Sequence, residues 1–121
     1  MRTFEALRDV RPHLLRDGIT ARAVQGERIT MAVVDLEPKA TLPEHHHENE
    51  QLGFVIKGTI EFRIGSDKRV LEAGDTYVIP SQVPHEAVAG PRGATVADVF
   101  APVRADWAGL QRADPSPPDW P

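Results

Sequence analysis

The 121-residue chain contains no cysteine. This absence excludes disulfide bonds and thiolate metal sites, and it removes the usual sequence clue to a redox compartment. The chain also lacks an apolar run long enough to cross a bilayer, and its first ten residues lack the apolar centre of a secretory signal. We therefore expect a cytoplasmic protein with no membrane partner.

The chain also lacks a strong excess of charge of either sign. The net charge is −4, and Lys and Arg are scattered along the chain rather than gathered in a basic stripe. Nucleic acid is therefore not an expected partner. A chain of this length has room for one domain with one modest core.

What the sequence does contain is a succession of short β-type apolar runs separated by turn residues. The main runs span residues 19–24, 29–36, 51–56, 59–64, 76–80, 83–88 and 94–100. This length and spacing are typical of an all-β sandwich or barrel and leave no room for helical crossovers. We expect turns at Lys57–Gly58 and at 89–93, where neighbouring runs meet.

We divide the chain into an N-terminal arm (1–17), a β-barrel domain (18–107) and a Pro-rich tail (108–121). Pro12 interrupts a loosely helical spacing, so the arm is expected to be a short helical turn or irregular. The tail cannot continue a sheet or a helix. It is either a disordered end or a strap across a neighbouring surface.

Two of the runs, 29–36 and 51–56, are apolar at both strand parities. Both faces of these strands should therefore be covered. The barrel interior covers one face, and the other needs a second sheet, the N-terminal arm or another subunit. We expect a homodimer.

Three consecutive histidines stand at the start of the segment PEHHHENEQLGFVIKG (43–58). In a strand, side chains at i and i+2 share a face, so His45 and His47 should project together while His46 points outward. Two imidazoles on one face begin a site for a divalent metal ion, and the distant His85 can supply another ligand.

Gln51 has the same parity as the two inward histidines, so its amide oxygen can join them as a ligand or lie behind them in a supporting hydrogen bond. Glu48 and Glu50 have the opposite parity and are expected at a solvated loop edge. Three imidazoles and one amide leave the charge of a divalent ion uncompensated, which favours an incoming anion. Zinc, nickel, manganese and iron all accept such ligands.

Two motifs in this chain resemble those of the cupin superfamily, over roughly residues 25–105. They are formed by His45, His47, Gln51 and Gly58 and by Gly74, Pro80 and His85. The resemblance implies a double-stranded β-helix, a jelly-roll barrel that holds a metal. The chain departs from the motifs at Lys39 and Gln82, which stand where Gly is usual, and at Gln51, which stands where Glu is usual.

A narrower resemblance joins HENEQLGFVIKG (47–58) with ADVFAPVRADW (97–107). Together they look like the cupins of pectin and alginate breakdown, which convert unsaturated uronic acid monosaccharides into open-chain keto forms. This resemblance implies four metal ligands, namely His45, His47, Gln51 and His85. It also implies roles in catalysis and substrate binding for Asp98, Phe100 and Arg104.

The residue types support these roles, with structural alternatives. Asp98 lies in an apolar run, where an unpaired carboxylate is costly, and it shares its strand parity with Phe100. It is a candidate general acid or base, or else a structural partner for an Arg or a backbone amide. Arg104 can clamp a substrate carboxylate, or it is a surface charge at the strand end.

We therefore predict a metal-dependent isomerase or lyase that acts on a small anionic oxygenated molecule such as an unsaturated uronic acid. Three alternatives use the same site. They are an iron-dependent dioxygenase, a polyketide cyclase, which needs a wide apolar cavity, and a small-molecule-binding module without catalysis.

Overall fold

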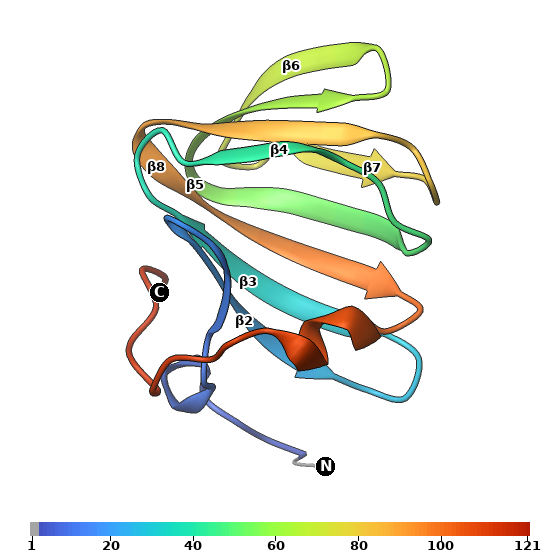
Figure 1. Ribbon diagram of the computed structural model, residues 1–121. Coiled ribbons are helices and arrows are strands. Elements are labelled where there is room, and N and C mark those ends of the chain that lie inside the picture. The colour runs from blue at the N-terminus through green and yellow to red at the C-terminus, as the bar shows by residue number, and fades with distance from the viewer. Residues whose placement is uncertain (1–2) are drawn as a thin grey trace.

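The computed structural model describes residues 3–121, and its regular elements are almost all β-strands (Figure 1), as the sequence predicts. In chain order its elements are η1 (Leu7–Asp9), β1 (His13–Arg16), β2 (Ile19–Gln25), β3 (Thr30–Leu36), β4 (Thr41–His45), β5 (Glu50–Ile64), β6 (Asp67–Glu72), β7 (Thr76–Ile79), β8 (His85–Ala101) and η2 (Ala105–Gly109). Within residues 3–121, no helix is long and apolar enough to span a membrane.

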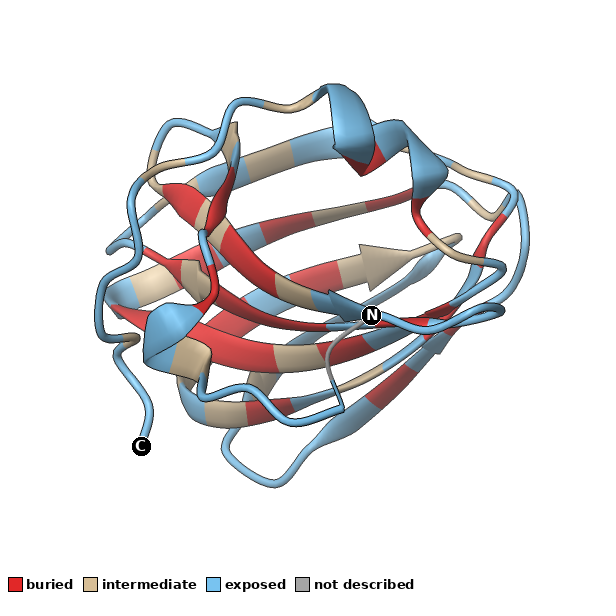
Figure 2. Cartoon of the chain, turned by 90° about the horizontal axis from the view of Figure 1, so that it is seen from below, coloured by how far each residue is buried: buried red, intermediate tan, exposed pale blue. Residues whose placement is uncertain are grey.

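Two long antiparallel strands, β5 and β8, pair along their whole length and run through both layers of a jelly roll. In the larger layer, residues 94–100 of β8 pair with β3, and residues 51–54 of β5 pair with β7. In the smaller layer, the first part of β8 pairs with β4 and the last part of β5 pairs with β6. Strands β1 and β2 extend the larger layer beyond β3. The two layers enclose the core, where buried residues lie along the strands (Figure 2).

The turns predicted at Lys57–Gly58 and at 89–93 are wrong, because both strands continue through these positions. Gly58 and Gly93 each have φ +77°, and the β5–β8 register shifts on both sides of this point. A Cβ on Gly58 would lie 2.1 Å from the Gly93 carbonyl oxygen. Glycine therefore bends the pair from one layer into the other without ending the ladder.

The N-terminal arm contains the expected helical turn, η1, but it also contains a strand that the sequence did not predict. This strand, β1, pairs with β2 at the edge of the larger layer. On its other side, His13 forms an isolated bridge with Arg112, so the C-terminal segment lies beside the arm. A four-residue edge strand gives too short a pattern to identify from sequence.

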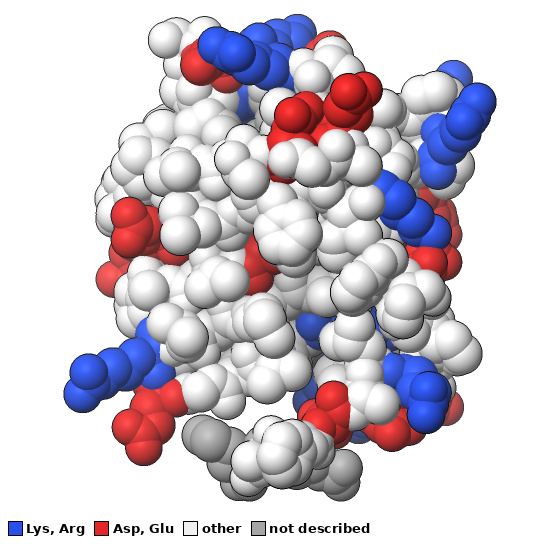
Figure 3. Space-filling view, turned by 180° about the vertical axis from the view of Figure 1, so that it is seen from behind, with Lys and Arg blue, Asp and Glu red and all other residues white. Residues whose placement is uncertain are grey.

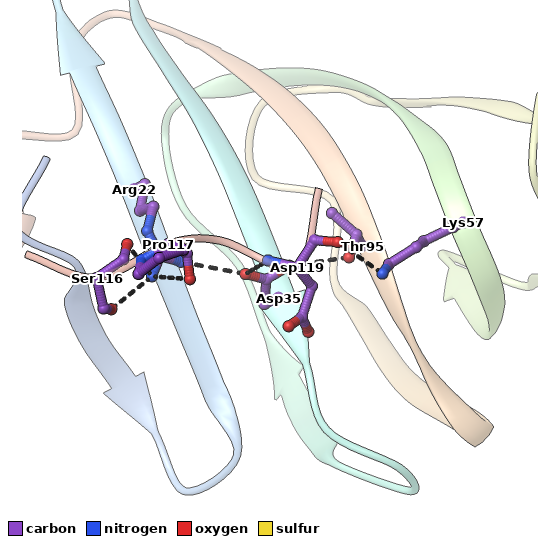
Figure 4. A network of polar contacts seen from close by, with 7 residues as sticks. All are labelled: Arg22, Asp35, Lys57, Thr95, Ser116, Pro117 and Asp119. Carbon is purple, nitrogen blue, oxygen red and sulfur yellow. Dashed lines mark hydrogen bonds and ion pairs between the residues drawn. The ribbon is translucent and has the colours of Figure 1, made fainter. Parts of the chain in front are cut away.

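The Pro-rich tail is a strap across the outer face of the larger layer, not a disordered end (Figure 4). Arg22 donates to Ser116 Oγ at 2.9 Å and to the Pro117 carbonyl at 3.3 Å. Lys57 Nζ donates to the Asp119 carbonyl at 2.7 Å. The tail thus makes polar contacts with three strands, β2 through Arg22, β3 through Asp35 and β5 through Lys57.

Candidate metal centre

The three predicted imidazoles converge at one end of the barrel. Strands β4 and β8 pair so that His45 lies opposite His85, and their ring centroids are 4.2 Å apart. His47 lies in the short connection from β4 to β5, and its ring centroid is 4.9 Å from that of His85. One ring nitrogen from each histidine lies within 4.8 Å of the other two.

Backbone carbonyls fix the tautomer of all three rings. Nδ1 of His45 contacts the Pro43 oxygen at 3.0 Å, and Nδ1 of His47 contacts the Asn49 oxygen at 2.9 Å. Nδ1 of His85 contacts the Val83 oxygen at 2.9 Å. A carbonyl oxygen only accepts, so each Nδ1 carries the proton and each Nε2 presents a lone pair. Metal-binding histidines are held in the same way.

The electrostatics of the cluster also fit a metal ion. Burial lowers the pKa of His47, and it lowers the pKa of His85 to about 4, so both rings are neutral near pH 7. Within the described residues, the buried His47 Nε2 has no hydrogen-bond partner. A buried polar atom without a partner is costly, and a metal ion would satisfy it. The cluster can therefore hold a metal.

Two turns lack the usual glycine, one before β4, which carries His45, and one before His85. Lys39 and Gln82 have φ +62° and +66°, so the glycine-type backbone persists at both positions. The Gln82 N–H donates to the His47 carbonyl at 2.8 Å. The turn before His85 is thereby joined to the loop that carries His47.

The remaining polar residues of the histidine loop point in different directions. His46, Glu48 and Glu50 are exposed, as expected. Asn49 is buried, and its amide donates to the Pro102 and Val103 carbonyls at 2.6 and 3.2 Å. Sequence reasoning missed this residue, which ties the histidine loop to the segment after β8.

Gln51 is buried on β5, in register with Ile79 on one side and Phe100 on the other. Its amide lies between the metal cluster and Asp98. Burial lowers the pKa of His47 and raises the pKa of Asp98. The Gln51 amide partly opposes both shifts through its side-chain hydrogen bonds. The structure therefore brings Gln51 to the site that its parity predicts.

Asp98 lies on β8 in a row with Gly53 of β5 and Tyr77 of β7. Burial raises its pKa to about 6, although the Tyr77 hydrogen bond, the Gln51 amide and the Arg104 charge all oppose this shift. The Tyr77 hydroxyl donates to Asp98 Oδ1. The side chain thus titrates near neutral pH in an apolar setting.

The Tyr77–Asp98 contact passes over Gly53. A Cβ on this glycine would lie 2.3 Å from both Asp98 Oδ1 and Tyr77 Cζ. Sequence reasoning missed both Gly53 and Tyr77. The available signal was a glycine inside an apolar strand, which often marks a close approach by another group.

Arg104 is not a surface charge, since only 9% of it is exposed. Its guanidinium lies 4.8 Å from the Phe100 ring centroid and 4.7 Å from the Trp107 ring centroid. The guanidinium therefore makes cation–π contacts with both rings. Its Nε and Nη2 atoms donate to the two carboxylate oxygens of Asp106 at 3.0 and 2.9 Å. Its backbone N–H donates to Thr30 Oγ1 at 2.9 Å.

These groups share one cavity of about 260 Å³ inside the barrel. Its wall is largely apolar, and its polar side chains include His45, His85, Gln51, Asp98, Arg104 and Asp106. Drug-sized ligands usually occupy roughly 300–1,000 Å³. The cavity therefore suits a molecule of monosaccharide size.

The chain is similar to known proteins in both sequence and structure. Residues 32–100 match the Cupin domain family. The pectin degradation protein KdgF of Dickeya dadantii (strain 3937) is 30% identical over 95 residues, which cover 77% of this chain and 86% of that protein. Among solved structures, KdgF from Halomonas sp. is 29% identical, with a TM-score of 0.80 over 88% of this chain and 98% of that chain.

An RmlC-like cupin from Shewanella frigidimarina NCIMB 400 has a TM-score of 0.82 at 23% identity. The match covers 88% of this chain and 96% of that chain. At this identity the likeness concerns the fold alone.

Proposed function

The chain belongs to the cupin family, and we propose that it is a metal-dependent isomerase or lyase acting on a small anionic sugar acid, of the unsaturated uronate class. The observation that carries this proposal is the meeting of three imidazoles, Asp98 and Arg104 at one small cavity. Similarity to KdgF, a pectin degradation protein, supports the substrate class.

A divalent ion would be held by His45, His47 and His85, with Gln51 as the fourth ligand. When bound, it would supply Lewis acidity that stabilises negative charge developing on a substrate oxygen. Because all four ligands are neutral, the bound site is cationic and favours an anionic substrate. Zinc, nickel, manganese and iron all suit these ligands.

Arg104 binds the substrate carboxylate. Its guanidinium is buried and held against two aromatic rings, so little rotational freedom is lost when the anion binds. The planar fork of N–H donors matches the two oxygens of a carboxylate. Asp106 already makes this two-pronged contact from within the chain, and the substrate replaces it.

Asp98 moves the proton. A pKa of about 6 gives the carboxyl group appreciable populations of both protonation states near neutral pH, which suits a general acid or base. Tyr77 holds the carboxylate by its hydrogen bond, and Phe100 forms the cavity wall beside Arg104. Proton transfer at carbon and opening of the sugar ring both need such a group.

The cavity helps to choose among the alternatives. Its volume of about 260 Å³ is small for a bulky aromatic polyketide, so it favours a sugar acid over a cyclase substrate. A passive binding module has no need for a buried carboxyl group whose ionised form destabilises the fold. Both observations favour the isomerase or lyase.

The test is the rate at which ultraviolet absorbance of an unsaturated uronate monosaccharide is lost, measured above its spontaneous rate. Wild-type protein supplied with each of the four metals should accelerate the loss with at least one of them. Asp98→Asn should remove most of this acceleration, whereas His46→Ala, which alters an exposed neighbour of the cluster, should retain it. No acceleration by wild type with any metal, or equal rates for wild type and Asp98→Asn, would overturn the proposal.

A further inference from the structure

Asn49 is a buried polar residue that the proposed chemistry does not use. It lies in the loop that joins β4 to β5, between the exposed residues Glu48 and Glu50, and only 5% of it is exposed. This loop is at the right-hand edge of Figure 1 and therefore at the left-hand edge of the view from behind, where acidic side chains are exposed (Figure 3). Burying an amide costs free energy unless it is hydrogen-bonded, so the contacts of Asn49 indicate its role.

The Asn49 side chain is hydrogen-bonded to the segment that follows β8. Its Nδ2 atom lies 2.6 Å from the Pro102 carbonyl oxygen and 3.2 Å from the Val103 carbonyl oxygen. Carbonyl oxygens only accept, so the NH₂ group and not the amide oxygen must face them. These carbonyls follow the pair of Glu50 with Ala101, which is the end of the β5–β8 ladder. The Asn49 side chain therefore continues the connection between β5 and β8 beyond their backbone pairing.

The segment that Asn49 holds forms a tight turn centred on Arg104. The Ala105 N–H donates to the Val103 carbonyl at 2.9 Å, and Arg104 between them has φ −77° and ψ 72°. These values are typical of an inverse γ-turn. The Val103 oxygen thus accepts one hydrogen bond from within the turn and one from Asn49. Moving this carbonyl would change the direction in which the Arg104 side chain leaves the backbone.

The backbone of Asn49 holds a histidine of the candidate metal centre. Its carbonyl oxygen accepts a hydrogen bond from His47 Nδ1 at 2.9 Å. Asn49 is therefore bonded to His47 through its backbone and to the Arg104 turn through its side chain. The two side chains that it holds also share a neighbour. The Phe100 ring centroid lies 6.0 Å from the His47 ring centroid and 4.8 Å from Arg104 Cζ.

A substrate of the proposed reaction must reach both of these side chains at once. One of its oxygens would contact the metal ion held by the histidines, and its carboxylate would contact Arg104. A small cyclic molecule keeps its oxygens at nearly fixed distances from one another, so the protein must hold the two groups at a matching distance. A misplacement of about 1 Å can reduce the rate on the order of 100-fold.

We propose that Asn49 is a positioning residue that fixes the distance between the metal ligand His47 and the carboxylate-binding Arg104. Because both of these groups are assigned to one substrate, this role of Asn49 rests on the proposed function. The two side-chain hydrogen bonds carry the role, and the volume of the side chain does not. Leu has nearly the same shape as Asn but no donor, so Asn49→Leu separates hydrogen bonding from packing.

The first measurement is metal affinity, which needs no turnover. Zinc and nickel are titrated by calorimetry into metal-free wild type, Asn49→Ala, Asn49→Leu and His46→Ala, with circular dichroism to verify that each protein is folded. Both Asn49 variants should bind the ions at least about 10-fold more weakly than wild type. His46→Ala alters an exposed residue of the same loop and should match wild type. Equal affinities of wild type and Asn49→Leu would overturn the inference, as would wild type that binds neither ion.

A double-mutant cycle tests whether Asn49 acts through Arg104. In metal-saturated protein, Asn49→Leu should lower kcat/KM for the unsaturated uronate roughly 10-fold to 100-fold. Lys has a flexible stem and no planar fork, so its contact depends less on the geometry of the turn. In an Arg104→Lys background, Asn49→Leu should therefore lower kcat/KM by no more than about twofold. Equal factors in the two backgrounds would indicate a general loss of structure and would overturn the inference.

Crystal structures separate this role of Asn49 from the proposed function. In metal-free Asn49→Leu the Arg104 turn should be displaced by about 1 Å or more relative to the three histidine rings, and in His46→Ala it should not. If wild type turns over no uronate, the proposed function fails, whereas weaker metal binding and a displaced turn still support the role of Asn49. An undisplaced turn would overturn that role even in an active enzyme.

Discussion

The phenol of Tyr77 and the carboxylate of Asp98 meet over a strand position that has no side chain. The residue between them is Gly53, in register with both partners. The contact anchors the carboxylate of an otherwise apolar strand at the cavity wall. The contact therefore requires a residue without a Cβ at position 53 as well as Tyr77 and Asp98 themselves.

Gly53→Ala should therefore disturb the site more than its size suggests. The new Cβ would lie 2.3 Å from both partners, so the strand or the tyrosine must move. We expect a loss of about 1–3 kcal/mol in the free energy of unfolding, and a clear loss of activity, because the carboxylate is displaced. Chemical denaturation and uronate turnover measure the two effects.

The matched control is Gly109→Ala, since a Cβ at Gly109 meets nothing within 4 Å. It should change stability by no more than about 0.5 kcal/mol. Equal stability of the two alanine variants would contradict the close approach at Gly53.

Asp98→Asn should stabilise the metal-free protein at neutral pH. The carboxyl pKa is raised from 3.8 to about 6 in the folded state. Asp98 therefore destabilises the folded state progressively as pH rises between these two values, by roughly 3 kcal/mol in total. Asn cannot ionise, so the free energy of unfolding of the variant should match that of wild type near pH 4. At pH 7 it should be higher than that of wild type by roughly 3 kcal/mol.

Urea unfolding of both proteins across this pH range measures the difference. Histidine titrations affect wild type and variant alike, so they largely cancel in the comparison. A constant difference from pH 4 to pH 7 would show that Asp98 does not titrate as its burial requires.

Much of this site could be predicted from sequence, because its strongest signals are chemical and local. His45 and His47 share a short segment, and His85 follows a turn of recognisable spacing. The Tyr77–Gly53 arrangement could not be predicted, because it depends on which strands lie beside β5. Strand register is set by long-range pairing and leaves little mark on any one segment.

The fold, like the site, could be predicted from the sequence only in part. The apolar runs locate most strands, but Gly58 and Gly93 were interpreted as turn residues when they bend continuous strands. A glycine with positive φ serves either purpose, and only the partner strand decides between them. The strap was one of two open outcomes, since its anchors at Arg22 and Lys57 are distant in sequence.

Gln82→Gly should stabilise the turn before His85. Gln82 has φ +66°, a conformation that costs a residue with a Cβ about 1 kcal/mol and costs glycine little. Gln82→Ala retains the Cβ and is the matched control. Thermal and urea unfolding should show that the free energy of unfolding of the Gly variant is about 1 kcal/mol higher than that of the Ala variant. A lower value for the Gly variant would contradict a strained turn.

Asp106→Asn should lower the KM for an anionic substrate and leave kcat nearly unchanged. Asp106 occupies the donor edge of Arg104, but its side chain is 63% exposed, so the ion pair is weak. Removing this competitor should lower KM roughly twofold to fivefold, as expected for an exposed pair worth about 0.5–1 kcal/mol.

Asp67→Asn removes an exposed ion pair with Arg69 in β6 and serves as the control, with no expected effect on KM. A higher KM in Asp106→Asn would mean that Asp106 orients Arg104 and is not displaced by the substrate.

Metal binding by wild type, His85→Ala and His46→Ala tests the central claim most directly. Each protein is dialysed against zinc, nickel, manganese or ferrous salts, and bound metal is measured by elemental analysis and calorimetry. Wild type and His46→Ala should bind one equivalent of at least one ion, and His85→Ala should bind it at least about 100-fold more weakly. Wild type that stays metal-free in all four salts, or His85→Ala that binds as tightly as wild type, would contradict the account.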